Sequence, residues 1–365
     1  MPVKAAVVGG GFAGLATALE LAKWGVKVDL YEEHREVGYP PHCTGIVSGK
    51  VVSWLGKAGR TSLREQFKEI KIAYKSRELA IIEPLDGVYR LDRVLLEKLL
   101  LDEGVSEGVE AMLGVKVTSV NPEGKLVAGG KARKYYDLVV IADGWRRSIS
   151  SRLGLGGYKA RLTGVNLVAE SREDKVKPGE IRVEFWTSRS EGFFEWEVGL
   201  GPKLVLAGTA SRNPSHAAAM VRDAHGKYSR VLSVYGGQVV LGPPQGPLRK
   251  GKVIVVGDAG GLTKPLTGGG LYPVTKMLVK GRRFFEKGSS PLDALHNSLE
   301  SIAKELRRHG ESAKLVLDRE ELLGRVVKVI DEPLKVKMPF DSHTPSTLIY
   351  STVKTLPTAI TIALK

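Results

Sequence analysis

Several residue types are scarce in this chain of 365 residues, and each shortage excludes a class of protein. It contains a single cysteine, Cys43, so no internal disulfide can form. There is no run of cysteines for an iron–sulfur centre, and we expect no metal site. No apolar run reaches the length of a membrane span, and no secretory signal precedes the first predicted strand. We therefore expect a cytoplasmic protein.

Amide side chains are also few, with three Gln and four Asn, whereas the net charge is +15. Lys and Arg are scattered and accompany no nucleic-acid-binding motif, so we expect no nucleic-acid partner. A solvated, thermophile-like surface is the favoured explanation. Attraction to anionic lipid or a phosphorylated substrate is the alternative, with peripheral membrane contact. Packing on the body is favoured over membrane contact for the apolar tail Leu356–Leu364.

The most informative feature is a glycine-rich turn between a predicted strand at 5–8 and a predicted helix. Gly9, Gly11 and Gly14 have the G-x-G-x-x-G spacing of a dinucleotide site. The first glycine allows a tight turn, the second allows close approach of a pyrophosphate, and the third allows helix–strand packing. Glu32 ends the next predicted strand, 18 residues after Gly14, where a carboxylate binds a ribose. The pattern predicts a dinucleotide site.

Later segments select FAD over NAD. The apolar strand predicted at 253–256 leads into Gly257-Asp258, and Gly268, Gly269 and Gly270 then open a helical stretch at 271–281. A carboxylate suits the ribityl hydroxyls of a flavin, and backbone N–H groups at a helix N-terminus suit its pyrimidine edge. A dehydrogenase that uses NAD needs neither feature. The cofactor predicted is FAD.

The arrangement of predicted elements indicates an α/β fold with an insertion. Short strand-like runs at 162–170, 180–186, 193–200 and 204–210 predict an antiparallel sheet. We expect a discontinuous Rossmann-like FAD-binding domain, an inserted antiparallel β-sheet substrate domain and a mainly helical C-terminal region. Their respective ranges are 1–70, 88–155 and 245–290 for the first, 71–87 and 156–244 for the second, and 291–365 for the third.

Three segments carry a resemblance to a known family. They are Gly38-Tyr-Pro-Pro-His-Cys-Thr-Gly-Ile-Val-Ser48, Leu91-Asp-Arg93, and the stretch from Gly257 to Gly270. The FAD segments resemble those of the aromatic hydroxylase-like flavoproteins, with a GR2/PHBH-like FAD domain. Within that group, the chain is most similar to the geranylgeranyl reductase family. That family includes the digeranylgeranylglycerophospholipid reductase-like enzymes of archaea, which saturate isoprenoid chains of ether lipids.

The resemblance implies a set of FAD contacts. Arg93 would face the phosphate and ribose, and the backbone of Val117 would meet the adenine. The contacts implied are Ala13, Glu32, Cys43, Thr44, Ile46, Arg93, Val117, Asp258, Gly270 and Leu271.

The chain departs from the family pattern at two places. Phe194 and Trp196 match the aromatic segment thought to line the substrate cavity, but Val198-Gly199 stands where Phe-Pro is expected. Arg147 occupies a position where related chains usually have Ser. Neither change affects the FAD motifs, and both leave the substrate open.

The resemblance implies an FAD-dependent reductase of geranylgeranyl or other isoprenoid double bonds. The electron donor is open among NAD(P)H, ferredoxin and others. Cys43 is a candidate catalytic thiol, although a free cysteine is more often a small packed residue. A flavin monooxygenase of the same fold and an electron-transfer flavoprotein are the alternatives. A halogenase is disfavoured, because the Trp-x-Trp-x-Ile-Pro signature is absent.

Overall fold

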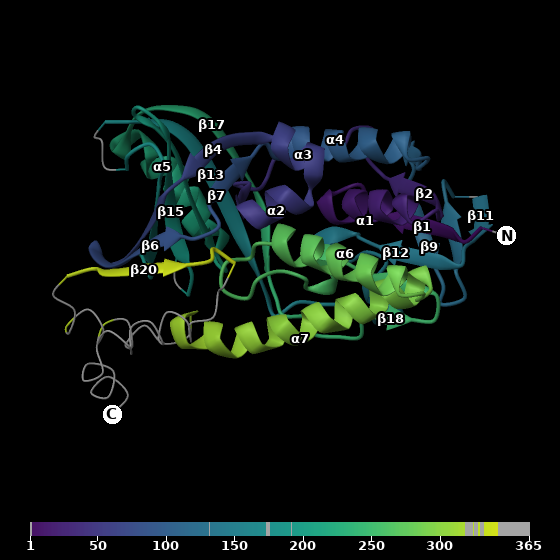
Figure 1. The fold of residues 1–365 in the computed structure, drawn as a ribbon. Helices are drawn as coiled ribbons and strands as arrows, with labels where there is room; N and C mark the ends of the chain where they lie inside the picture. Colours follow the sequence, from purple (N-terminus) through teal and green to yellow (C-terminus); the bar gives the residue numbers. More distant parts are fainter. Residues whose placement is uncertain are drawn as a thin grey trace.

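A computed structural model describes residues 2–130, 132–172, 176–190, 192–317, 324, 328 and 332–341. The tail Leu356–Leu364 lies outside this range. Two β-sheets form the two ends of the molecule, and long helices cover the first of them (Figure 1). Within the described part of the chain, no helix is both long and apolar enough to cross a bilayer.

The first sheet has six strands in the order β18-β19-β12-β1-β2-β8. Its central strands are parallel and buried on both faces, as their continuous Ala, Val, Leu and Ile content predicts. Successive connections leave β1 in opposite directions, so β1 and β12 form the switch point where open α/β sheets bind ligands. The strands are β18 (Arg249–Lys250), β19 (Val253–Val255), β12 (Leu138–Ile141), β1 (Lys4–Val8), β2 (Lys27–Glu32) and β8 (Glu110–Leu113).

Helices cover this sheet and pack on one another. They are α1 (Phe12–Lys23), α2 (Gly49–Trp54), α3 (Gly56–Thr61), α4 (Arg93–Ser106), α6 (Leu271–Glu286) and α7 (Pro291–Leu317). Helices α1 and α6 are joined by the stacked rings of Trp24 and Phe285, whose centroids are 4.9 Å apart. The buried Glu20 accepts hydrogen bonds from Trp24 Nε1 at 2.9 Å and Arg282 Nε at 2.6 Å. These contacts join the C-terminal ends of the two helices.

The second sheet has eight strands in the order β17-β13-β16-β15-β14-β5-β6-β20. It is largely antiparallel, with parallel pairs β14–β5 and β20–β6. Helix α5 (Pro214–Lys227) packs on one face through Val165, Leu167 and Ala169. Because side chains alternate along a strand, Gly164 and Asn166 of β13 lie on the opposite face. The strands are β17 (Tyr228–Leu241), β13 (Ala160–Ser171), β16 (Leu204–Ser211), β15 (Phe194–Gly201), β14 (Glu180–Phe185), β5 (Glu69–Tyr74), β6 (Arg77–Pro84) and β20 (Leu334–Met338).

Two three-stranded sheets complete the fold: β3-β7-β4 joins the two halves, and β11-β10-β9 lies beside β2. Their strands are β3 (Ile46–Ser48), β4 (Leu63–Phe67), β7 (Val88–Leu91), β9 (Val117–Val120), β10 (Lys125–Ala128) and β11 (Ala132–Tyr135). Short 3₁₀ turns lie at η1 (Gly144–Arg146), η2 (Ser151–Leu153) and η3 (Gly257–Gly260). The predicted α/β class with an inserted, largely antiparallel sheet is confirmed.

The C-terminal region contains a strand that the sequence pattern did not predict. After α7 the chain returns as β20, which pairs with β6 at the edge of the eight-stranded sheet. Five residues are too few for a clear alternation, and the partner strand lies some 250 residues away in sequence, with Val336 opposite Ile82. The tertiary partner alone defines this strand.

Candidate active site

The three motif glycines have different surroundings at the end of β1. Gly9 has φ +111°, and a Cβ there would lie 2.3 Å from the Ala142 carbonyl oxygen. A Cβ on Gly14 would lie 1.9 Å from the Gly9 oxygen, so this glycine allows α1 to pack against the turn. A Cβ on Gly11 would meet nothing within 4 Å. The space next to Gly11 is therefore open to a ligand.

Glu32 ends β2 beside this turn. Its carboxylate accepts hydrogen bonds from the backbone N–H groups of Gly10 at 2.6 Å and His34 at 2.8 Å. A Cβ on Gly10 would lie 2.9 Å from Cβ and Cγ of Glu32, so Gly10 is needed for this approach. The G-x-G-x-x-G spacing gave no reason to single out Gly10, and only the register of β1 with β2 reveals its role.

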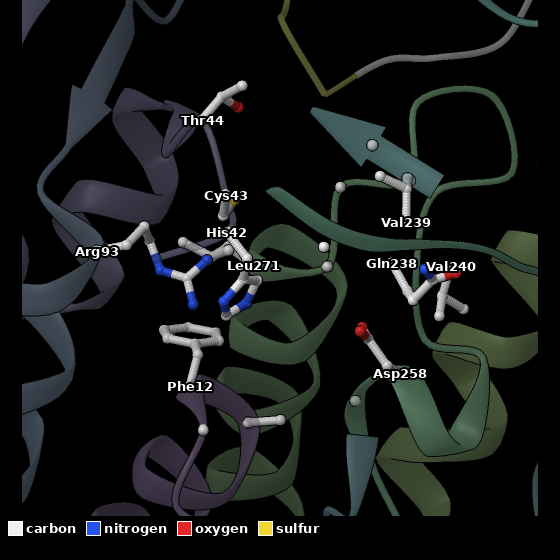
Figure 2. A pocket seen from close by; sticks show the side chains of 18 of the residues that line it. Phe12, His42, Cys43, Thr44, Arg93, Gln238, Val239, Val240, Asp258 and Leu271 are labelled. Carbon is white, nitrogen blue, oxygen red and sulfur yellow. The ribbon is translucent and has the colours of Figure 1, made fainter. Parts of the chain in front are cut away.

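Helix α1 begins without a capping side chain. Its N-cap is Gly11, and no acidic residue lies in its first turn, so its free N–H groups face the cavity. Arg93, at the start of α4, lies 5.5 Å from the centroid of the Phe12 ring (Figure 2). Its Nη2 is bound to Glu97, whereas its buried Nε has no hydrogen-bond partner among the described residues. Burial lowers the pKa of Arg93, but Glu97 and the neighbouring Cys43 together raise it by more, so this side chain stays cationic.

Asp258 faces this cluster from the other side of the cavity (Figure 2). Residues 264–270, which we call the glycine loop, also contribute to the cavity lining. Helix α6 also starts at a glycine N-cap, Gly270, with no side-chain cap. A Cβ on Gly270 would lie 3.5 Å from Oδ1 of Asp258. Burial raises the pKa of Asp258, and the charges of His42 and Arg93 oppose that rise only in part.

Cys43 and His42 lie between these two groups of residues. The Cys43 sulfur is half-buried and accepts the N–H of Gly45 at 3.4 Å. His42 Nδ1 lies 3.1 Å from the Pro40 carbonyl oxygen, which fits a ring that donates from Nδ1. A Cβ on Gly237 would lie 3.0 Å from Cβ of His42, so strand β17 approaches this histidine closely.

One cavity of about 1150 Å³ connects all of these groups. Gly14 is the single predicted site residue that does not line it. The predicted residues that line it are Gly9, Gly11, Ala13, Glu32, Cys43, Thr44, Ile46, Arg93, Val117, Phe194, Trp196, Asp258, Gly268, Gly269, Gly270 and Leu271. Residues that the sequence did not single out include Phe12, Trp145, Lys264, Met338, Phe340 and Asp341. Of these, Lys264 had one available signal: it is the single lysine or arginine in the glycine-rich stretch from Gly257 to Gly270.

The half of the cavity that faces the large sheet is mainly apolar, although Asn166 of β13 and Gln238 of β17 also line it. Trp196 forms part of its wall. A Cβ on Gly208 would lie only 2.4 Å from the Trp196 ring, so the ring packs directly against this glycine. The indole Nε1 donates to Asn166 Oδ1 at 3.1 Å, so its one polar atom is satisfied. The apolar residues that line this half are Ile70, Ile72, Leu79, Ala80, Ile82, Ile181, Val183, Phe185, Phe193, Phe194, Val198, Leu334, Met338 and Phe340.

The residues present fit a dinucleotide with a flavin ring. Two uncapped helix N-termini, an open Gly11 and the unpartnered Arg93 Nε supply donors for phosphate and for a ring edge. Glu32 and Asp258 supply carboxylates for hydroxyl groups. Among the described residues, no group of three or more His, Cys, Asp or Glu side chains could hold a metal ion.

Comparisons with known sequences agree with this geometry. The family model of FAD-dependent oxidoreductases (DAO) matches residues 4–95. The chain is 25% identical to the digeranylgeranylglycerophospholipid reductase of Methanothrix thermoacetophila, over 83% of this chain and 84% of that protein. It is 22% identical to the enzyme of the same name from Thermoplasma acidophilum, over 89% and 91% of the two chains.

Solved structures show the same fold. A geranylgeranyl bacteriochlorophyll reductase-like protein from Thermoplasma acidophilum superposes with a TM-score of 0.78 at 17% identity, covering 99% of this chain and 98% of that one. The 2-methyl-3-hydroxypyridine-5-carboxylic acid oxygenase superposes with a TM-score of 0.67 at 17% identity, covering 96% of both chains. The chain is thus an FAD-dependent oxidoreductase and a distant homologue of the digeranylgeranylglycerophospholipid reductases.

Proposed function

We propose that this oxidoreductase reduces carbon–carbon double bonds of an isoprenoid lipid chain. The observation that carries the proposal is the apolar wall that continues directly from the FAD residues. Along the sheet side of the cavity, the described residues include no Arg or Lys other than Lys264, which is already paired with Asp341. A carboxylated substrate would need a charged partner there, whereas a hydrocarbon chain needs none. The polar side chains on that sheet, Asn166 and Gln238, are already bonded to Trp196 and Thr163.

We infer that the FAD is held by the residues the sequence singled out. Phosphate would lie at the start of α1 next to Gly11 and Arg93, and the adenine end would lie between Glu32 and Val117. Asp258 and the α6 start would meet the ribityl chain and the ring. The remaining contacts proposed are Gly9, Ala13, Cys43, Thr44, Ile46, Gly268, Gly269, Gly270 and Leu271.

The protein's own contribution to the reaction is placement and exclusion of water. When bound, reduced FAD supplies a hydride to an alkene. Isolated alkenes are unactivated, so the isoprenoid chain of the substrate must lie flat against the flavin ring in a dry cavity. Phe194 and Trp196 provide rigid apolar surface for this purpose. Cys43 is the candidate proton donor, because it is half-buried between the FAD residues and the apolar wall.

Anaerobic incubation with dithionite and a geranylgeranyl lipid tests the proposal. We expect mass spectrometry of the lipid to show additions of two hydrogens. No mass gain, combined with substrate-stimulated NAD(P)H oxidation and oxygen uptake, would instead indicate a monooxygenase. Replacement Cys43→Ala should slow the reduction, and unchanged turnover would dismiss the thiol as proton donor.

A further inference from the structure

A buried ion pair joins the glycine loop to the C-terminal segment. Lys264 is 5% exposed and Asp341 is 6% exposed, and Lys264 Nζ is bonded to Oδ1 of Asp341. The ammonium also lies 5.1 Å from the centroid of the Tyr272 ring and 5.0 Å from that of Phe340. Both ends of the pair line the cavity. None of the site functions derived above uses this pair.

The backbone of Lys264 closes the glycine loop. Its N–H donates to the Gly269 carbonyl oxygen at 3.1 Å, and its own carbonyl accepts the Gly268 N–H at 2.9 Å. Its side chain runs along the loop, with Cδ 3.7 Å from where a Cβ on Gly269 would stand. The loop ends at Gly270, the N-cap of α6. Lys264 therefore supports the peptide groups that face the flavin ring in the proposed binding mode.

The other end of the pair belongs to the cavity wall. Strand β20 pairs with β6, and the Leu85 N–H donates to the Met338 oxygen at 3.0 Å. The Phe340 N–H donates to Asp86 Oδ1 at 2.9 Å. This attachment brings Met338 and Phe340 into the apolar half of the cavity.

The attachment of residues 334–341 depends on the positive charge of Lys264, because this segment brings buried carboxylates together. Oδ2 of Asp341 and Oδ2 of Asp86 are buried and lack a hydrogen-bond partner among the described residues. Lys50 also pairs with Asp86, with Nζ 3.7 Å from Oδ2, but the Lys50 side chain is half-exposed. Loss of the Lys264 charge would leave a buried carboxylate without its partner, which favours release of the segment.

We propose that Lys264 and Asp341 form a positioning pair that links FAD binding at the glycine loop to closure of the apolar cavity by residues 334–341. A loop ordered by FAD holds Lys264 in place, and Lys264 holds the segment. By reciprocity, an attached segment strengthens FAD binding. The proposal depends on FAD binding and is independent of which substrate occupies the cavity.

Two measurements on Lys264→Met and Asp341→Asn test the link. The first is the FAD dissociation constant of the apoprotein, which we expect to rise by about tenfold or more in each variant, within the usual range of coupling between sites. The second is trypsin cleavage after Lys335 and Lys337 in β20. We expect FAD to protect these bonds in the unmodified protein and to protect them much less in either variant. The double variant should be no weaker in FAD binding than the single ones.

Glu83→Gln is the matched control. It breaks the exposed Glu83–Lys337 pair (2.9 Å) between the same two strands, outside the cavity, and should change neither measurement. If Lys264→Met does not fold, Lys264→Met/Asp341→Leu replaces the pair by apolar side chains and should fold with the protection by FAD lost. FAD affinity within twofold of the unmodified protein, or undiminished protection of β20 by FAD, would overturn the proposal.

Discussion

At the scale of single residues, Gly11 and Gly14 of the same motif have different roles: Gly11 leaves space for a ligand, and Gly14 allows the helix to pack. A Cβ at Gly14 would overlap the Gly9 carbonyl oxygen at 1.9 Å, whereas a Cβ at Gly11 would stand in open space. Gly11 has φ −78°, which alanine adopts without strain. The same substitution at these two positions should therefore have opposite consequences.

We expect Gly11→Ala to leave the free energy of unfolding of the apoprotein within about 1 kcal/mol of the original. Its methyl group should block the approach of the pyrophosphate and weaken FAD binding at least about tenfold, equivalent to ~1.4 kcal/mol. Gly14→Ala should lower the free energy of unfolding by about 1–3 kcal/mol through overpacking. Urea unfolding and flavin fluorescence titration measure the two effects. Equal destabilisation by both substitutions would contradict the assignment.

Asp258 should make the stability of the apoprotein depend on pH. Burial raises the pKa of Asp258 in the folded protein above the ordinary 3.8. At a pH between 3.8 and the folded-state pKa, Asp258 is ionised in the unfolded chain but keeps its proton in the folded protein. Stability is therefore full below about pH 3.8 and falls as the pH rises through the folded-state pKa. Asp258→Asn removes this loss.

We thus expect Asp258→Asn apoprotein to be more stable than the original at neutral pH, with the difference vanishing in acid. The same substitution should weaken FAD binding, because the ribityl hydroxyls lose a carboxylate partner. Urea unfolding of the two apoproteins across pH 4–8 measures the stability difference. A difference that does not change with pH would show that ionisation of Asp258 is not its cause.

At the scale of elements, the pairing of β15 with β16 positions the cavity wall. Trp196 lies directly opposite Gly208, and its indole occupies the space that a side chain at 208 would need. Because Gly208 of β16 has no side chain, the indole of Trp196 on β15 can lie over it. This is the element-scale reason why Trp196 lines the cavity.

Gly208→Ala should force the indole to move. We expect a loss of about 1–3 kcal/mol in the free energy of unfolding, as for other overpacked sites, and a shift in tryptophan emission. In a Trp196→Phe background the same alanine should cost less, because the smaller ring leaves room. Equal costs in both backgrounds would place the strain elsewhere.

At the scale of the whole molecule, the proposed FAD contacts come from elements that are far apart in sequence. They lie at the ends of β1 and β2, at the start of α4 and around the start of α6. A ligand that touches all of them stabilises the folded state over the unfolded chain by mass action.

We expect FAD at one hundred times its dissociation constant to raise the free energy of unfolding by about 2.7 kcal/mol. Thermal unfolding with and without FAD measures this. ADP at the same concentration reaches only the Gly11, Glu32 and Arg93 end, so it should raise the unfolding temperature less. An ADP effect as large as that of FAD would indicate that the α6 side contributes nothing to binding.

Local patterns predicted many of the residues that line the cavity, because glycine turns and strand ends are set by main-chain geometry. The end of β2 carries Glu32, and the turn into α1 carries Gly11, so a strand, a turn and a helix in register are enough to find them. His42, Lys264 and Phe340 had no such pattern. Each acquires its place from a partner more than 70 residues away: Gly237, Asp341 and Asp86 respectively.

Sequence alone determined the α/β class and the cofactor, because glycine turns and strand ends impose the same backbone requirements in any chain. Only the tertiary structure decided how the cavity is closed. Strand β20 exists because β6 offers unpaired backbone groups, and a buried lysine persists because Asp341 neutralises it. Such pairings depend on which surfaces meet after folding, and no local spacing encodes them.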